Sequence, residues 1–268
     1  MADAVYDLHE GDAPLLVSMP HCGTQLMPGL ERRLTPAALD LRDTDWHVPR
    51  LYDFVRDMGA SVIAARHSRY VVDLNRPPND ESLYPGQATT GLCPTTLFDG
   101  SPLYRDGEQP GPDEIAERLD RYWRPYHEAL AASLERIRAK HGFALLYDAH
   151  SIRSRVPRLF EGRLPDLNLG TARGESCGAD RRERVAAALT AAAAEAGFTA
   201  AVDGRFVGGY ITRHYGRPAE GVEAIQMELT QCSYMDEDGP PFDFREDRAE
   251  RIRPVLRRVL SAFLGQPA

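Results

Sequence analysis

The chain has 268 residues, of which 43% are hydrophobic and 27% are charged, a composition typical of a globular protein. Its net charge of −8 at pH 7 argues against a nucleic-acid partner, because an acidic protein is repelled by phosphate groups. There is no apolar run of the roughly 18 residues that a membrane span needs, and the acidic N-terminus lacks a secretory signal. We therefore expect a cytoplasmic protein with no membrane partner.

The periodicity of apolar residues predicts strands and helices that alternate along the chain. In chain order we expect strand 14–19, helix 45–58, strands 60–65 and 69–74, helix 112–140, strand 143–148, helix 180–196, strand 223–229 and helix 246–264. Gly59, Gly142 and Gly197 are expected to end the helices that precede them, while Pro125 and Pro254 should split or interrupt theirs. Several strand segments are apolar almost throughout, which is typical of strands covered on both faces.

This alternation predicts an α/β sandwich with a mixed, mostly parallel central sheet and helices on both faces. We treat residues 1–268 as one domain. Two long stretches, 75–112 and 151–178, are rich in Pro and Gly and poorly periodic, and we expect such loops to be functional. The four cysteines match no zinc-ribbon spacing and are expected to be reduced thiols. The sequence does not indicate an oligomeric state.

Candidate catalytic residues lie where the predicted strands end, because open α/β sheets bind ligands at the carboxyl ends of their strands. His21 follows the first strand, His150 follows the fourth, and Glu228 lies at the end of the last. Each residue alone is explained equally well by a structural hydrogen bond or an ion pair. Together, two histidines and a carboxylate at equivalent positions are compatible with a metal site, since catalytic zinc uses three protein ligands and one open position, but their spacing alone leaves the structural explanation open.

The carboxylate ligand of such a site has two candidates, Asp43 and Asp45, at the start of the predicted helix 45–58. Capping of the helix N-terminus is the alternative explanation for an aspartate at this position. We choose Asp45, which leads directly into the predicted helix, and leave Asp43 open.

Arginines next to Gly- and Pro-rich turns indicate a site for an acidic small molecule, because a guanidinium group pairs bidentately with a carboxylate. Arg69 and the Asn75–Arg76 pair bracket one predicted strand, and the glycine-flanked loop 208–216 carries Tyr210, Thr212 and Arg213. Surface ion pairs are the alternative explanation for any one of these arginines.

Nine segments in order along the chain match motifs of a known family. They are SMPHCG (18–23), DTDWHVPRLYDF (43–54), SRYVVDLNRPP (68–78), LYPGQATTGLCP (83–94), RYWRPYHEAL (121–130), LLYDAHSIRS (145–154), RLFEGRLPDLNLGT (158–171), GRFVGGYITRHYGRP (204–218) and QMELTQCSYMDE (226–237). On these segments the chain resembles the N-formylglutamate amidohydrolases, also called N-formylglutamate deformylases. The resemblance implies a fold similar to that of the zinc carboxypeptidases, in which two histidines and a carboxylate hold the metal.

The resemblance also assigns roles to individual residues. It implies that His21 and His150 bind Zn²⁺ or another divalent metal together with a carboxylate, and that Glu228 is the general base. For the carboxylate we choose Asp45, with Asp43 as the competitor. Arg76 would stabilise the oxyanion, and Asp148 could orient the His150 ring. The implied substrate contacts come from Arg69 and Asn75, which bracket one predicted strand, and from the loop that holds Tyr210, Thr212 and Arg213. Arg153 is a further candidate.

The reaction implied is hydrolysis of N-formyl-L-glutamate to formate and L-glutamate, the last step of a histidine-degradation route. Two alternatives remain open at this stage. One is a related amidohydrolase that acts on another N-acyl or formimino amino acid. The other is a catalytically inactive relative that only binds a ligand.

Overall fold

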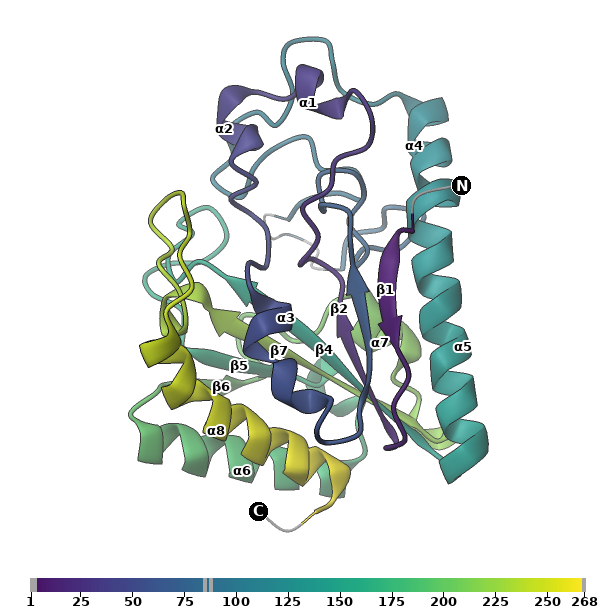
Figure 1. Cartoon of the computed structure of the whole chain (residues 1–268), viewed down its shortest axis with the longest axis vertical. Helices are drawn as coiled ribbons and strands as arrows, with labels where there is room; N and C mark the ends of the chain where they lie inside the picture. Colours follow the sequence, from purple (N-terminus) through teal and green to yellow (C-terminus); the bar gives the residue numbers. More distant parts are fainter. Residues whose placement is uncertain (1–3, 84–85, 87–88, 267–268) are drawn as a thin grey trace.

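Seven strands form one mixed sheet at the centre of the computed structural model, which describes residues 4–83, 86 and 89–266 (Figure 1). The strands are β1 (Tyr6–His9), β2 (Leu15–Met19), β3 (Ser61–Ala65), β4 (Ala144–Ile152), β5 (Leu167–Gly170), β6 (Ala200–Val202) and β7 (Val222–Thr230). Their order is β1-β3-β2-β4-β7-β5-β6, and only the β1–β3 and β7–β5 pairs are antiparallel. The predicted mixed, mostly parallel sheet is therefore confirmed.

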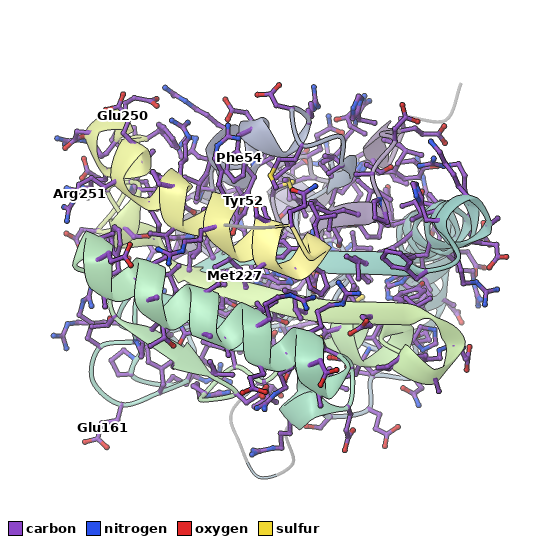
Figure 2. The ribbon with its side chains drawn as sticks, turned by 90° about the horizontal axis from the view of Figure 1, so that it is seen from below. Tyr52, Phe54, Glu161, Met227, Glu250 and Arg251 are labelled. Atoms are coloured by element: carbon purple, nitrogen blue, oxygen red, sulfur yellow. The ribbon has the colours of Figure 1, made fainter. Side chains whose placement is uncertain are left out.

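Helices cover both faces of this sheet, as expected. The α-helices are α1 (Leu30–Arg33), α2 (Pro36–Leu39), α3 (Val48–Leu51), α4 (Pro112–Arg118), α5 (Arg124–His141), α6 (Ala179–Ala196), α7 (Tyr210–Tyr215) and α8 (Glu246–Leu264). A π-helix, Leu119–Trp123, joins α4 to α5, and 3₁₀ turns span Asp53–Val55, Ala172–Gly174, Pro218–Glu220 and Gln231–Ser233. Helices α6 and α8 lie next to each other over one face, as seen from below in Figure 2, while α5 and α7 lie on the other (Figure 1).

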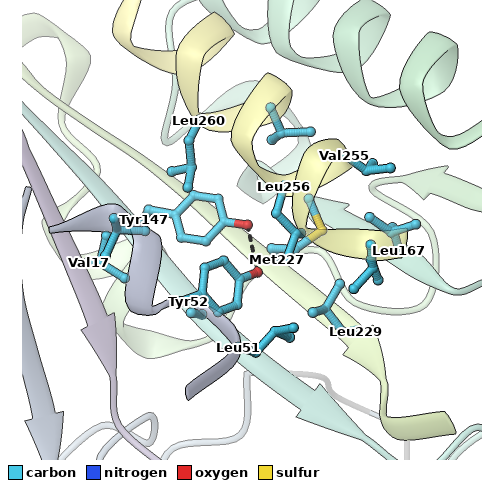
Figure 3. Packing of buried hydrophobic residues seen from close by; sticks show 14 of the residues in the cluster. Val17, Leu51, Tyr52, Tyr147, Leu167, Met227, Leu229, Val255, Leu256 and Leu260 are labelled. Carbon is cyan, nitrogen blue, oxygen red and sulfur yellow. Dashed lines mark hydrogen bonds between the residues drawn. The ribbon is translucent and has the colours of Figure 1, made fainter. Parts of the chain in front are cut away.

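The sheet separates two apolar cores, because successive side chains of a strand point to opposite faces. Val17 and Tyr147 pack with Leu256 of α8 in the first core, where the Tyr52 and Tyr147 hydroxyls are 2.9 Å apart (Figure 3). Leu16 and Leu146, the neighbours of Val17 and Tyr147 along their strands, join the second core under α5. All residues of β2 and β4 are buried, as expected for strands covered on both faces.

The strand expected at 69–74 is wrong, since these buried residues form turns instead. The Val71 amide donates to the Ser68 carbonyl at 2.9 Å, which closes a turn. The guanidinium of Arg118 donates to the carbonyl of Val71 at 2.9 Å and takes the place of a neighbouring strand. An apolar, β-branched run that is buried by helices has the same sequence pattern as a buried strand, and this similarity misled the prediction.

The helix expected at 45–58 is also wrong in extent, because only α3 and one 3₁₀ turn form there. His47 takes a left-handed backbone conformation with φ of 61°, which prevents the helix from beginning earlier. The loop expected at 208–216 instead contains the short helix α7. At the C-terminus α8 continues through Pro254, where a proline removes one hydrogen bond but the buried apolar face of the helix offsets that loss.

The remaining boundaries agree with the sequence to within a few residues. Gly142 and Gly197 end α5 and α6 with positive φ values of 80° and 75°, the conformation that glycine adopts without strain. The short strands β1, β5 and β6 were not anticipated. Within the long loop 75–112, residues 84–85 and 87–88 lie outside the described part of the chain. Among the described residues no helix combines the length and apolar character needed to cross a bilayer.

Candidate metal centre and active site

Three neighbouring parallel strands bring the predicted catalytic residues to one edge of the sheet. His21 lies two residues beyond the end of β2, and His150 lies within β4. Glu228 of β7 is directly opposite His150 in the strand register. Because β2, β4 and β7 are adjacent and parallel, their carboxyl ends form the crevice in which α/β sheets bind ligands.

Asp45 joins the two histidines from the loop that precedes α3. Its backbone amide donates to the carbonyl of His21 at 3.0 Å, which ties the two segments together. Its carboxylate lies 3.1 Å from Nδ1 of His150 and 3.8 Å from Nδ1 of His21. One potential ligand atom from each of the three buried residues lies within 4.8 Å of the others, so the trio can surround a single ion.

Asp43, the competing carboxylate, points elsewhere. It accepts a hydrogen bond from the Phe98 amide at 2.9 Å and lies 3.7 Å from the guanidinium of Arg153. The structure therefore groups Asp45, and not Asp43, with the two histidines. Arg153 pairs with Asp43 and is not among the described residues that line the cavity below.

A buried carboxylate contacts the far nitrogen of each histidine. Nε2 of His21 lies 2.7 Å from Asp73, and Nε2 of His150 lies 2.8 Å from Asp148. A carboxylate in this position accepts the Nε2 proton and leaves the Nδ1 lone pair available as a ligand. Both Nδ1 atoms face Asp45, so the two rings are oriented for the same centre.

Asn75 completes this arrangement from a position where it was expected to touch the substrate. Its side-chain oxygen accepts the Ile211 amide at 2.8 Å, which places its NH₂ group 3.1 Å from Asp148 and 2.9 Å from Nε2 of His150. A Cβ atom on Gly209 would lie 2.4 Å from this amide nitrogen, so only glycine fits beside it. Asn75 lines the cavity, but its amide is already committed to orienting Asp148.

Electrostatics at the centre favour a bound cation. The carboxylates of Asp45, Asp73 and Asp148 are buried, and Arg69 pairs with Asp73 at 2.7 Å and approaches Asp45 to 3.9 Å. Burial alone would raise the pKa of Asp73, but Arg69 and His21 outweigh it and hold that pKa well below its usual range. One guanidinium does not balance three buried carboxylates, and a divalent cation would.

The two histidines differ in their protonation. Burial and the nearby charge of Arg69 lower the pKa of His21, which stays neutral as a ligand must. Burial also opposes the charged form of His150, yet the carboxylates of Asp148 and Asp45 hold its pKa well above its ordinary value. Without a cation, His150 therefore carries a proton between two carboxylates, in the place where a metal would lie.

Glu228 has the properties of a general base or acid. Burial raises its pKa to about 8, with Asp45 and Asp148 adding to this effect and His150 and Arg69 opposing it. A carboxylate with a pKa near neutrality can both take and return a proton at physiological pH. Its oxygen lies 3.5 Å from the side-chain nitrogen of Gln226, the residue two positions earlier on the same strand.

A cavity opens directly onto this centre. Its polar wall contains His21, Asp45, Asn75, His150, Gln226 and Glu228, and its apolar wall contains Phe98, Ile152, Leu159 and Phe206. Three arginines also line it: Arg69, Arg76 and Arg205. A polar wall with three guanidinium groups suits a small anionic molecule.

Three residues expected to contact the substrate are not among the described lining residues. Arg213 donates to the carbonyls of Gly208 at 2.9 Å and Leu83 at 3.1 Å, outside the cavity. Tyr210 packs on the rings of Trp123 and His214, and Thr212 is fully buried. The cause is the helix α7, which the sequence analysis interpreted as a loop. The Tyr210 and Ile211 amides in its first turn donate to Asn75, so this turn contacts the site through its backbone.

Comparison with known proteins supports the same assignment. Residues 13–235 match the family model of the N-formylglutamate amidohydrolases. The chain is 54% identical over 263 residues to the N-formylglutamate deformylase of Pseudomonas aeruginosa and covers 97% of that protein. The chain belongs to the N-formylglutamate amidohydrolase family. It is also 51% identical over 264 residues to the N-formylglutamate deformylase of Pseudomonas putida, again with 98% of this chain and 97% of that protein covered.

Structural comparison extends the match to a solved member of the family. The crystal structure of N-formylglutamate amidohydrolase from Ralstonia eutropha superposes with a TM-score of 0.79, at 27% identity and with 97% of each chain covered. The predicted family and the predicted α/β fold are thus confirmed. The prediction that the chain is an enzyme that hydrolyses an amide bond is confirmed as well. The expected likeness to zinc carboxypeptidases stays a prediction.

Several residues of the site in this family member were not predicted from the sequence. Asp73 holds His21, Gln226 lies beside Glu228, and Arg205 follows the short strand β6. Arg205 follows a strand that runs antiparallel to β7, so the carboxyl end of that strand does not lie at the edge that holds the metal site, and a three-residue strand is also too short to detect by periodicity. Asp73 was hidden because its segment was interpreted as a strand.

Proposed function

We propose that this protein hydrolyses N-formyl-L-glutamate to formate and L-glutamate, using a divalent metal, with Zn²⁺ preferred, held by His21, Asp45 and His150. The observation that carries the proposal is the buried trio itself: Asp45 joins His21 and His150, which adjacent parallel strands place at one edge of the sheet. Glu228 lies opposite His150 on the next strand. Two imidazoles and one carboxylate are the donor set of many catalytic zinc sites. As the family resemblance implies, this reaction would complete a histidine-degradation route.

The metal would supply Lewis-acid chemistry, which polarises a carbonyl group and lowers the pKa of water. Glu228 takes a proton from the water that attacks the formyl carbon and later delivers it to the departing amine of glutamate. Burial raises the pKa of Glu228 and a bound divalent cation would lower it again, and these opposing effects would keep it in the range that suits this double role. Asp73 and Asp148 keep the two imidazole rings fixed while the charge at the centre changes.

Cations of the cavity wall would bind the two carboxylates of the substrate and its developing oxyanion. Arg76 donates through Nε to the carbonyl of Thr90 at 2.9 Å, and its guanidinium lines the cavity as the proposed oxyanion group. Arg205 replaces Arg213 as the proposed partner of a substrate carboxylate. Arg69 lines the same cavity, but its ion pairs with Asp73 and Asp45 assign it mainly to the charge balance of the centre.

Formate release from a panel of N-acyl glutamates, N-acyl aspartates and formimino-glutamate tests this proposal. N-formyl-L-glutamate should give the highest kcat/KM, and Glu228→Gln should lower turnover on the order of 10²–10⁴-fold while metal content is unchanged. Glu223→Gln is the matched control, because Glu223 lies at the other end of β7 and pairs with Arg181. A near-normal rate for Glu228→Gln would remove Glu228 from the mechanism, and a metal-loaded protein with no turnover on any substrate would favour a ligand-binding relative.

A further inference from the structure

Segment 73–76 carries three side chains of the site, Asp73, Asn75 and Arg76, yet it belongs to no helix or strand. A segment of this kind has no hydrogen-bond ladder to fix its carbonyl groups. Side chains or amides from two helical regions supply these bonds instead.

Each carbonyl from Leu74 to Arg76 accepts a separate donor. Nε1 of Trp123 lies 3.0 Å from the carbonyl oxygen of Arg76, and Nε2 of His127 lies 2.9 Å from that of Leu74. Between them, the Tyr210 amide donates to the Asn75 carbonyl at 3.3 Å. Trp123 and His127 themselves lie outside the set of described residues that line the cavity.

The two donors form one rigid unit. The rings of Trp123 and His127 are stacked with centroids 3.8 Å apart, and the Tyr215 hydroxyl lies 3.0 Å from Nδ1 of His127. Burial lowers the pKa of His127 to about 3, so the imidazole is neutral and has one N–H group to donate. That N–H is directed to the Leu74 carbonyl, and the Tyr215 hydroxyl is shared between Nδ1 and the His127 carbonyl, which lies 3.2 Å from it.

The π-helix Leu119–Trp123 explains how these donors reach the segment. Arg118, which binds the carbonyl of Val71, and His127 are nine positions apart and would lie about 180° apart around a regular α-helix. One extra residue in a π turn reduces this separation by about 100°. Arg118, Trp123 and His127 can therefore face the same stretch of chain, from Val71 to Arg76.

We propose that Trp123 and His127 are positioning residues of the hydrolase, which act by holding the backbone of residues 74–76 and thereby place the guanidinium of Arg76 in the cavity. This inference rests on the role of Arg76 proposed above. The π turn is the structural device that aligns the two donors with the segment.

The first test is Trp123→Phe, which keeps an aromatic ring against His127 but deletes the N–H group. We expect kcat/KM to fall on the order of tenfold, with zinc content and thermal stability close to wild type, because displacement of a catalytic group is costly even without unfolding. The matched control is Trp46→Phe, since the buried indole N–H of Trp46 has no hydrogen-bond partner among the described residues. The control should retain wild-type kcat/KM.

A second pair of variants keeps the test decisive if Trp123→Phe does not fold. His127→Phe retains a stacked ring without the N–H, whereas His127→Gln retains an N–H donor. We expect kcat/KM to fall in the first and to be partly restored in the second. Equal values for the two variants, or losses fully explained by lower thermal stability, would overturn the inference.

A double-mutant cycle with Arg76→Ala identifies the path of the effect. If Trp123 acts through Arg76, Trp123→Phe should cause less than a twofold further loss in the Arg76→Ala background. Additive losses would overturn the inference and leave the function of Arg76 intact. A wild-type kcat/KM for Arg76→Ala would instead reject the proposed role of Arg76, and the inference with it.

Discussion

Acid sensitivity of folding is a direct consequence of the buried, neutral His127. Its pKa is lowered to about 3 by burial, whereas an exposed histidine in the unfolded chain titrates near 6.5. The unfolded state therefore binds more protons between these two values, and the free energy of unfolding must fall as pH decreases. The stability that comes from burying a neutral His127 is fully present above about pH 6.5 and is lost progressively as pH falls toward 3.

The magnitude follows from the two pKa values. Between pH 8 and pH 5 the unfolded histidine becomes protonated while the folded one does not. The protonated range covers about 1.5 pH units, from the unfolded pKa near 6.5 down to pH 5, so the free energy of unfolding falls by about 2 kcal/mol. Urea unfolding at pH 5, 6, 7 and 8 measures this loss, and His127→Gln removes it while the other titrating groups remain. We expect the wild type to lose about 2 kcal/mol more than the variant over this range. Identical pH dependence for the two proteins would refute the assignment of a neutral, buried His127.

Three further predictions concern the metal ligands, the substrate cations and the core. Asp45→Asn should weaken zinc binding on the order of 100-fold, while Asp43→Asn should leave it unchanged. Isothermal titration with zinc compares the two variants, and equal affinities would contradict the choice of Asp45 as the ligand. Arg205→Ala should raise KM about 10- to 100-fold, because the substrate carboxylate loses a charged hydrogen-bond partner. Arg155, which is exposed, provides the control variant Arg155→Ala. An unchanged KM for Arg205→Ala would exclude Arg205 from the carboxylate site. Tyr52→Phe should lower the free energy of unfolding by roughly 1–3 kcal/mol, because it leaves the buried Tyr147 hydroxyl without its partner (Figure 3). The double variant Tyr52→Phe/Tyr147→Phe should be more stable than this single variant. Denaturant unfolding measures both, and additive losses would contradict the prediction.

The sequence predicted the parts of this molecule that depend on local pattern. Strands β2, β4 and β7 are short apolar runs followed by polar residues, and this pattern was sufficient to place His21, His150 and Glu228 at the same edge of a sheet. The family motifs then indicated which chemistry these residues perform. The long helices α5, α6 and α8 were found because their apolar periodicity extends over many turns.

What the sequence could not predict depends on contacts between distant segments. The run 69–74 has the apolar, β-branched pattern of a strand, but contacts with distant residues hold it in turns, among them the hydrogen bond from the guanidinium of Arg118, more than 40 residues away, to the Val71 carbonyl. For the same reason Asp73 was not recognised as the partner of His21, although the two atoms lie 2.7 Å apart. Arg213 seemed suited to a substrate because its loop is flanked by glycines, but the α7 helix directs it to backbone carbonyls instead.

The central claim is that hydrolysis of N-formyl-L-glutamate depends on a metal held by His21, Asp45 and His150. The most direct measurement is formate release by protein purified without an affinity tag or chelator, then stripped of metal, and then supplied again with one equivalent of zinc. We predict near-stoichiometric zinc in the purified protein. Turnover should be lost when the metal is removed and should recover when zinc is added back. Full turnover by the protein after complete metal removal would contradict the account.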